Sequence, residues 1–529
     1  MNVINALQEY LNFTFNETPG MKALIMDADT IPVVSILFGM TEIIQKEVYL
    51  VQQLSDQTRD TLPHLNAICL LRPTKENMEL LRKELNNPKY GKYYLFFTNF
   101  LDSTQISLLS QSDVHEVVQK VMELYVDYMP VNDDLFISSC PNYYSVVGSN
   151  SMKNEQKTID SLMALCLSLK KNPAIRYQQN SELSKRIAEG LTQGLERQKK
   201  IFGPMNGTTI LILDRSFDPI TPLLTQWTYQ AMIHEFIGIE NGKIVLDNKP
   251  IILSNDSFFN EHMYLLFSDI TDSIIASVNE LTKKAGIASK QYRSLEEMKE
   301  TIEQIPQLKK ESAGVKKHLG IMNVINKIVS RRKMLDVSRL EQDIVCGSGR
   351  QELYQSVIQF FEGDYEVEDK LRVGLLYALK YEDKAQDIIE ELTIKGIPRN
   401  QIQLIDVVLR YAGSSKRPIE IFNKVKSIVG FVKKSVAGVE NVFVQHKPVL
   451  EQLYDPLINQ QLLDKFPFCR GSSANGREFI IYIVGGVTLE EEVSIATRNR
   501  TNPTQKFIIG GSDLLNSSKF IELLESMKK

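Results

Sequence analysis

The densest cluster of polar residues in the chain directly follows an apolar run that is typical of a buried strand. The cluster extends from Asp214 to Pro222 and contains Arg215, Asp218 and Pro219. Open α/β sheets place their functional side chains here, beyond the carboxyl ends of the strands. The cluster therefore suggests an α/β enzyme acting on a phosphorylated small molecule near Asp214, Arg215 and Asp218.

A structural role explains the same residues. Asp218-Pro219 and Thr221-Pro222 form a rigid turn, because proline fixes its own φ angle. An aspartate beside an arginine is more often an ion pair that fixes a domain junction than a catalytic pair. We favour the structural role and keep the enzyme as the alternative. A pocket converging on the three side chains would support the enzyme, and their burial would not.

Other signatures of chemistry are absent from the sequence. Neither G-x-x-x-x-G-K-[ST] nor G-x-G-x-x-G after a strand occurs. The six histidines include no H-E-x-x-H pair and the five cysteines no C-x-x-C pair, and G-x-S-x-G is missing. The charge runs 331–333 and 490–492 are expected to be solvated helix faces. We therefore expect no cofactor, no metal and no enzymatic activity.

The composition points to a folded chain of several domains. Its 529 residues are too many for one hydrophobic core and predict about three folding units. The net charge of −4 gives no global positive field, which argues against nucleic acid as a partner. No apolar run approaches the roughly 18 residues of a membrane span, so membranes should be reached only through partners.

The first 130 residues alternate short apolar runs with amphipathic segments. They predict strands at 23–26, 67–71 and 94–97, and helices at 41–54, from Pro73-Thr74 onward and at 113–128. Strands that alternate with helices form parallel sheets covered on both faces. This part of the chain therefore predicts an open α/β domain.

A second α/β unit follows and is completed from the far end of the chain. Its predicted elements are strand 135–138, the helical stretch 158–200, and strands 208–213, 479–484 and 506–509. Both late strands are expected to join the same sheet as strand 208–213.

The middle of the chain predicts a mainly helical insertion at 258–462, preceded by a β-hairpin at 243–253 around Asp247-Asn248. Within the insertion, the segment 294–305, Pro306 and a long helical run after it indicate a projecting helical hairpin bent at the proline.

One run is long and specific enough to identify a family. Residues 211–224, LILDRSFDPITPLL, continue through WTYQAM at 227–232 and resemble the signature of the SM (Sec/Munc-like) family of SNARE-binding proteins. Shorter matches lie at 21–27, 45–50, 72–77, 340–343 and 483–488. The runs 45–50 and 88–91, with Gln226-Trp227, are most similar to the vacuolar-protein-sorting branch of the endosomal and trans-Golgi route.

The resemblance implies an α/β fold of three domains arranged as an arch, with two open parallel α/β sheet domains and a large mainly helical domain that carries a helical hairpin. Residues 1–130 would form domain 1, which provides a groove on its outer face. Domain 1 would also form one wall of a cleft, flanked by domains 1 and 3, that holds the helices of a Qa-SNARE. Domain 2 would comprise 131–225 and 475–529, and domain 3 would comprise 226–474 with the hairpin around 294–335.

The resemblance also implies a function, the regulation of SNARE-mediated vesicle fusion. The chain would bind a syntaxin-type Qa-SNARE through its N-terminal peptide and its helical bundle, and would assist SNARE complex assembly. The peptide would insert an apolar side chain into a groove on the outer face of domain 1. The implied groove residues are Ile106, Leu109, Val117, Val121 and Glu123, for whose apolar members the domain core is the alternative place.

The hairpin is implied to template an R-SNARE beside the Qa-SNARE, with an ordinary packed helix pair as the alternative. The residues implied there are Pro306, Leu308, His318 and Leu319. Asp214, Arg215, Asp218 and Pro219 would be a structural signature.

Further implied partners are the assembled SNARE complex and a Rab effector. The resemblance implies a cytoplasmic monomer that associates peripherally with endosomal and trans-Golgi membranes through SNAREs. One difference from the family pattern lies at Gln52-Gln53, where relatives commonly carry charged residues that face the cleft. The polar contacts to the SNARE bundle that the family pattern implies are therefore not expected at these two positions.

Overall fold

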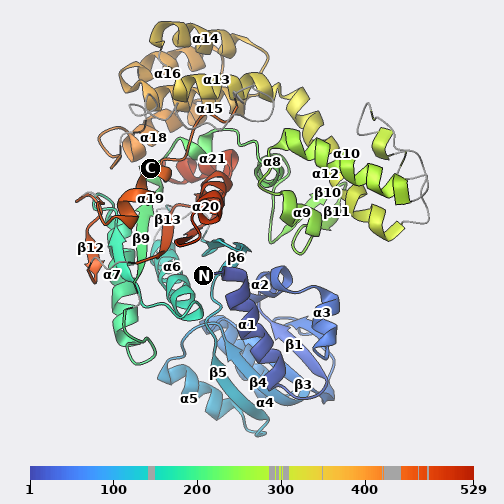
Figure 1. Cartoon of the computed structure of the whole chain (residues 1–529). Helices are drawn as coiled ribbons and strands as arrows, with labels where there is room; N and C mark the ends of the chain where they lie inside the picture. Colours follow the sequence, from blue (N-terminus) through green and yellow to red (C-terminus); the bar gives the residue numbers. More distant parts are fainter. Residues whose placement is uncertain are drawn as a thin grey trace. The chain divides into compact units, whose positions relative to one another are not determined.

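The chain forms two compact units, seen in a computed structural model (Figure 1). The first unit comprises Met1–Asp214, Pro456–Val487 and Ile495–Asp513, and the second comprises Arg215–Asp455, Thr488–Ser494 and Leu514–Lys529. The structure describes residues 1–140, 144, 149–205, 207–284, 292, 297–299, 301, 309–347, 349–419, 421, 443–462, 464–472 and 476–528. The division into three domains stays a prediction.

The first unit begins with a five-stranded parallel sheet in the order β2-β1-β3-β4-β5. Its strands are β1 (Lys22–Met26), β2 (Val48–Gln53), β3 (Leu62–Leu71), β4 (Tyr90–Phe97) and β5 (Val118–Glu123). The helices of this part are α1 (Val3–Glu17), α2 (Thr30–Leu37), α3 (Met40–Gln45), α4 (Lys75–Asn86) and α5 (Ser103–Ser112).

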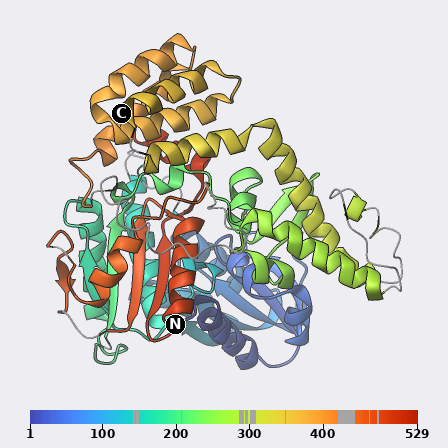
Figure 2. The same ribbon diagram turned by 45° about the horizontal axis from the view of Figure 1, so that its top comes forward.

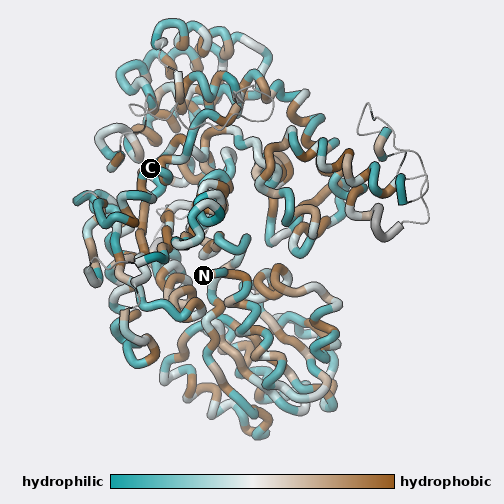
Figure 3. Tube along the Cα trace, in the orientation of Figure 1, coloured by the Kyte–Doolittle hydropathy of each residue, from teal (hydrophilic) through white to brown (hydrophobic). Residues whose placement is uncertain are grey.

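Alternation along the central strands divides their side chains between two cores. Leu24 and Ile68 join the core that contains residues of α1 and α2, whereas Ile25 and Cys69 join the core that contains residues of α4 and α5. Side chains of successive strand residues point to opposite faces, and both faces are covered. The prediction of an open parallel α/β domain is confirmed. Figure 3 shows hydrophobic stretches, coloured brown, in this part of the chain.

Two helices predicted in this part are wrong. The segment 41–54 contains the short helix α3, and then Glu47, at a φ of 62°, turns the chain into strand β2. The segment 113–128 contains strand β5, because Glu116 at a φ of 54° and the Asp113 carboxylate turn the chain beside β4. In both segments apolar residues at three- and four-residue spacings fitted a helix, but tertiary pairing made part of each a strand.

A seven-stranded sheet completes the first unit in the order β12-β8-β9-β13-β15-β7-β6. Its strands are β6 (Met129–Asn132), β7 (Leu135–Ile137), β8 (Ala174–Tyr177), β9 (Thr208–Asp214), β12 (Phe468–Arg470), β13 (Glu478–Val484) and β15 (Lys506–Gly511). Strand β13 pairs in parallel with β9 and with β15, which confirms that the late strands complete this sheet.

Helices α6 (Ser149–Ser168) and α7 (Glu182–Arg197) pack against each other beside this sheet. The stretch 158–200 is therefore mostly helical, but it also contains strand β8, which the helical periodicity on either side concealed. Short strands β14 (Val487–Thr488) and β16 (Leu514–Leu515) and helix α20 (Leu489–Thr501) lie where the chain passes between the units.

The second unit is mainly helical. Its helices are α8 (Tyr229–Phe236), α9 (Ser257–His262), α10 (Phe267–Lys284), α12 (Lys309–Arg331), α13 (Met334–Cys346), α14 (Arg350–Glu362), α15 (Val367–Lys380), α16 (Ala385–Ile394), α17 (Arg399–Ile402), α18 (Leu404–Ala412) and α21 (Ser517–Ser526), and α19 (Glu451–Ile458) crosses into the first unit. The predicted hairpin is confirmed as antiparallel strands β10 (Lys243–Leu246) and β11 (Lys249–Ile252).

Helices α10 and α12 lie side by side (Figures 1 and 2). They are joined by the segment in which a projecting hairpin was predicted. Pro306 and Leu308 lie outside the described residues. Among the described residues, no helix is long and apolar enough to span a bilayer.

His234 on α8 is a buried histidine held by backbone groups. Its Nδ1 accepts from the Ile239 N–H at 3.2 Å, and its Nε2 lies 3.3 Å from the Leu514 carbonyl. Burial and the nearby Lys519 ammonium lower the pKa of His234 to about 3. The imidazole is therefore neutral in the folded chain at physiological pH.

We predict that this histidine makes the fold acid-labile. An unfolded histidine binds a proton near pH 6.5, so below that pH the unfolded state binds more protons and stability falls as pH drops toward 3. For His234 the loss of unfolding free energy between pH 7.5 and pH 5 should be about 2 kcal/mol. Burial also lowers the pKa of His318 and His446, so the total loss in wild type includes their contribution. Denaturant unfolding at both pH values should therefore show that His234→Gln loses about 2 kcal/mol less than wild type. His115 is exposed, so His115→Gln is the matched control and should keep the pH dependence of wild type. Equal pH dependence of stability in wild type and His234→Gln would refute the role of His234.

Candidate functional site

A groove of about 650 Å³ opens between α5 and β5 on the first unit. Ile106 and Val121 are 52% and 46% exposed there, which is high for large apolar side chains, whereas Leu109 is buried. The lining residues are Leu101, Ile106, Leu109, Ser110, Asp113, Val118, Val121, Met122, Glu123 and Tyr125. The groove therefore offers an accessible apolar surface set on two regular elements.

Local capping positions helix α5. Asp102 accepts from the Gln105 N–H at 2.7 Å, and the Gln105 side chain accepts from the Asp102 N–H at 2.9 Å, which forms a capping box. The Gln105 amide also donates to the Pro73 carbonyl at 2.8 Å. These bonds fix the start of the helix and tie it to the loop after β3.

Two carboxylates shape the rest of the groove. Asp113 accepts from the N–H groups of Val117 and Val118 at 2.8 and 3.0 Å, and Glu123 accepts from the Leu101 N–H at 2.8 Å. Burial and the adjacent Glu123 raise the pKa of Tyr125 to about 12, so this lining residue is a neutral phenol. The groove thus combines an apolar floor with negative charge.

Four of the five residues implied for the groove line it: Ile106, Leu109, Val121 and Glu123. Val117 is not one of its lining residues; it is half-buried and packs against the core that contains Leu109. Val118 lines the groove in its place.

The polar signature after β9 is almost completely buried. Asp214 is 4% exposed, Arg215 and Asp218 are fully buried, and Pro219 is buried. In the first unit, the Asp214 carboxylate accepts from the hydroxyls of Tyr144 and Ser181 at 2.8 and 3.1 Å. These residues present no open catalytic surface among the described residues, which agrees with the structural interpretation.

In the second unit, the Arg215 guanidinium donates two parallel hydrogen bonds to Glu491 at 2.8 and 2.9 Å. The Asp218 carboxylate accepts from Thr221 Oγ1 at 2.6 Å and from the Val449 N–H at 3.1 Å. Although burial alone would raise it, the Arg215 charge and the neighbouring His446 hold the pKa of Asp218 below its usual range. The signature therefore fixes two distant segments, 446–449 and 488–492, to one turn.

The expectation that 490–492 is a solvated helix face is wrong. Glu491 and Glu492 are fully buried, because Glu491 pairs with Arg215 and Glu492 accepts from the Tyr264 hydroxyl at 2.7 Å. In the run 331–333, Arg332 pairs with the buried Asp369. Sequence alone gave no sign of these partners, which are distant along the chain.

His318 and Leu319 are buried near the middle of α12. His318 Nδ1 lies 2.8 Å from the Tyr229 hydroxyl, and its Nε2 lies 3.0 Å from Asp256, the N-cap of α9. His318 thus holds α12 to α8 and to the start of α9, and Leu319 belongs to the core cluster that contains Tyr229 and Phe259. In this conformation neither side chain is available to a partner.

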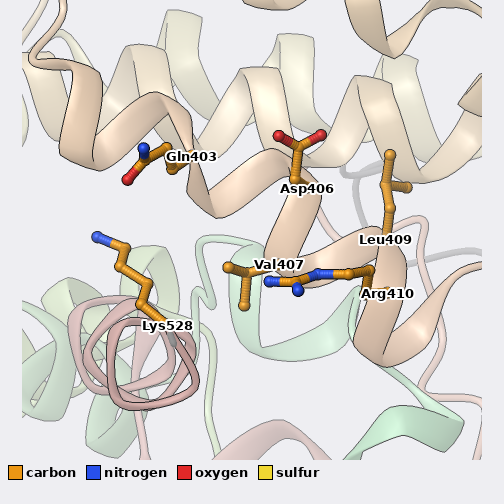
Figure 4. A pocket seen from close by; sticks show the side chains of 6 residues that line it. All are labelled: Gln403, Asp406, Val407, Leu409, Arg410 and Lys528. Atoms are coloured by element: carbon orange, nitrogen blue, oxygen red, sulfur yellow. The ribbon is translucent and has the colours of Figure 1, made fainter.

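A second hollow, of about 660 Å³, lies between α18 and the end of α21. Its lining is mostly polar, and Figure 4 shows Asp406 and Arg410 pointing in different directions. It therefore does not converge on one position. Among the described residues, no group of three or more histidine, cysteine, aspartate or glutamate side chains could hold a metal ion.

Comparison with known proteins shows the family of the chain. Residues 22–523 match the Sec1 family. Vacuolar protein sorting-associated protein 45 of Mus musculus is 36% identical over 99% of this chain and 96% of its own length. The chain belongs to the Sec1 family.

Solved structures of Sec1-family (SM) proteins share the fold. The SM protein Vps45, in complex with the Qa SNARE Tlg2, superposes with a TM-score of 0.87 at 31% identity, covering 100% of this chain and 98% of that one. A chain of the Unc18–syntaxin 1 complex from Monosiga brevicollis gives a TM-score of 0.84 over 100% of both chains, and at 20% identity this likeness shows the fold alone. The expected SM fold is confirmed.

We predict that the buried Arg215–Glu491 pair stabilises the second unit only as a pair. Arg215→Met alone should cost about 3–5 kcal/mol of unfolding free energy, since it leaves the Glu491 charge buried without a partner. The double variant Arg215→Met/Glu491→Leu should be more stable than Arg215→Met. Denaturant unfolding of both single variants and the double variant measures the coupling.

The exposed ion pair of Lys170 and Glu9 provides the control, because Lys170→Met should change stability little. Additive effects of Arg215→Met and Glu491→Leu would contradict the pairing.

Proposed function

We propose that this chain regulates SNARE-mediated vesicle fusion by binding a syntaxin-type Qa-SNARE and assisting SNARE complex assembly, in transport between endosome, trans-Golgi and vacuole. The observation that carries the proposal is the match along the whole chain, in sequence and in fold, to the SM protein Vps45, whose structure has been solved in complex with the Qa SNARE Tlg2. The names of the relatives, vacuolar protein sorting-associated protein 45, support the route.

The groove between α5 and β5 is the proposed site for the N-terminal peptide of the Qa-SNARE. Ile106 and Val121 expose apolar surface that a hydrophobic peptide side chain would cover. Asp113 and Glu123 favour a peptide that carries positive charge beside that anchor. A peptide bound here would tether the SNARE without occupying the surface that assembles into the four-helix bundle.

The work proposed for the chain is to organise the SNARE helices rather than to catalyse a reaction. A SNARE helix in isolation has an apolar seam that it cannot bury, and holding it in register lowers the entropic cost of pairing. No bond needs to be made or broken, so the buried Asp214, Arg215 and Asp218 serve the fold.

The predicted hairpin around 294–335, whose described part includes α12, is the proposed element for templating an R-SNARE. Because His318 and Leu319 are buried, we assign them to holding α12 in place rather than to contact with the R-SNARE. An assembled SNARE complex and a Rab effector are further proposed partners. The proposed location is the cytoplasmic side of endosomal and trans-Golgi membranes.

We predict that Val121→Arg abolishes binding of the Qa-SNARE N-terminal peptide while the fold stays intact. The change places a charge in the apolar groove at a side chain that is 46% exposed. Calorimetric titration should show a loss of about 2 kcal/mol or more, roughly thirtyfold in affinity.

Val114→Arg is the matched control, because Val114 is 73% exposed close to α5 but does not line the groove. It should bind like wild type. Unchanged affinity in Val121→Arg would reject the groove as the peptide site, and equal losses in both variants would reject its specificity.

A further inference from the structure

The amino edge of the seven-stranded sheet carries a concentration of positive charge. The chain enters strands β8, β9, β13 and β15 at this edge, because these strands are parallel. Basic residues precede or begin each of these strands. Strand β12 runs antiparallel to β8, so the basic residue that ends β12 lies at the same edge. They are Lys170 and Lys171 before β8, Arg197, Lys199 and Lys200 before β9, Arg477 before β13, Lys506 in β15 and Arg470 in β12.

Half of these cations are neutralised by partners. Lys170 pairs with Glu9, Lys171 with Glu478, Arg470 with Glu196 and Lys506 with Asp134. Arg197, Lys199, Lys200 and Arg477 are exposed and form no ion pair with any described residue. The exposed carboxylate of Asp133 precedes β7, two strands beyond β13 on the same edge. The edge around β9 and β13 therefore has four uncompensated positive charges.

Two large apolar side chains are exposed among these charges. Ile201 is 51% exposed and Met205 is 44% exposed, in the turn that joins α7 to β9. This turn lies beside the start of β13, because Gly476 approaches the Gly207 carbonyl closely. Unpaired cations from two loops thus flank two exposed apolar groups.

Ordinary explanations account for only part of this arrangement. Cations near the C-terminus of α7 interact favourably with the helix dipole, which explains Arg197. The dipole effect does not extend to Arg477, which precedes another strand. It also does not explain why Ile201, and Met205 whose methyl group lies over Gly471, each remain about half exposed. Basic residues interspersed with exposed apolar side chains are instead the pattern of surfaces that contact anionic membranes.

We propose that the turn 197–205, together with Arg477, contacts an anionic lipid bilayer directly. The four unpaired cations would lie against the negatively charged headgroups, and Ile201 and Met205 would enter the boundary between headgroups and acyl chains. The bilayer is the occupant that the composition favours, since it satisfies the charges and covers the apolar side chains at once. Such a contact would hold the chain at a membrane independently of any SNARE.

Sedimentation with SNARE-free vesicles tests this proposal on the full chain. Wild type should sediment with vesicles of phosphatidylcholine and phosphatidylserine and stay in solution with phosphatidylcholine alone. Lys199→Gln/Lys200→Gln should weaken partition about fivefold for each charge removed. Ile201→Ser/Met205→Ser should also weaken it, and both variants should keep the wild-type thermal midpoint because the altered side chains are exposed.

Matched controls use exposed residues of the same unit. Lys83→Gln/Lys92→Gln removes the same charge elsewhere, and Val114→Ser/Met152→Ser removes exposed apolar groups elsewhere. Both should bind like wild type.

Failure of wild type to bind the anionic vesicles would overturn the proposal, as would equal losses in the Lys199/Lys200 and Lys83/Lys92 variants. Binding to polyglutamate without binding to vesicles would also overturn it, because it would assign the surface to an acidic protein.

Discussion

The buried charge of Arg215 is the constraint on which much of the second unit depends. A guanidinium that is fully buried must be paired, because an unpaired buried charge costs several kcal/mol. Its partner Glu491 comes from the start of α20, and Asp218 in the same turn holds the segment around Val449. Residues far apart in the sequence must therefore meet at one turn before the fold is complete.

The same long-range closure governs the first unit. Strand β9 pairs with β13, so Thr208 lies opposite Glu478, and the seven-stranded sheet cannot form until the C-terminal strands are present. Most of the long segment between them, Arg215–Asp455, belongs to the mainly helical second unit and is an insertion between neighbouring strands. Pairings of this sequence separation form slowly, since the entropy of loop closure must be overcome first.

The groove follows from an edge of the five-stranded sheet that is left partly open. Strand β5 ends the sheet, and edge strands are usually protected against unwanted pairing. Here α5 and β5 both line the groove, while Val121 and Ile106 stay exposed. A surface of this kind is costly unless a partner covers it, which is why we interpret it as a peptide site.

The sequence predicted the elements that local patterns determine. The apolar runs of β1, β3, β4, β9, β13 and β15 and the hairpin at Asp247-Asn248 were evident from period and turn residues. Strands β2 and β5 were not, because each lies in a segment whose apolar spacing also fits a helix and is set by pairing with a neighbour. Four groove residues could be placed through the family resemblance, whereas Val118, Glu491 and the partners of His318 depend on three-dimensional contacts that no local pattern encodes.

The central claim is that a Qa-SNARE engages this chain through the groove between α5 and β5. Hydrogen exchange of the full chain, alone and mixed with the cytoplasmic part of an endosomal syntaxin-type SNARE, tests it most directly. The account predicts slower amide exchange in 103–112 and 118–123, lost when the N-terminal peptide of the SNARE is deleted. Binding of the intact SNARE without any change in these two segments would contradict it.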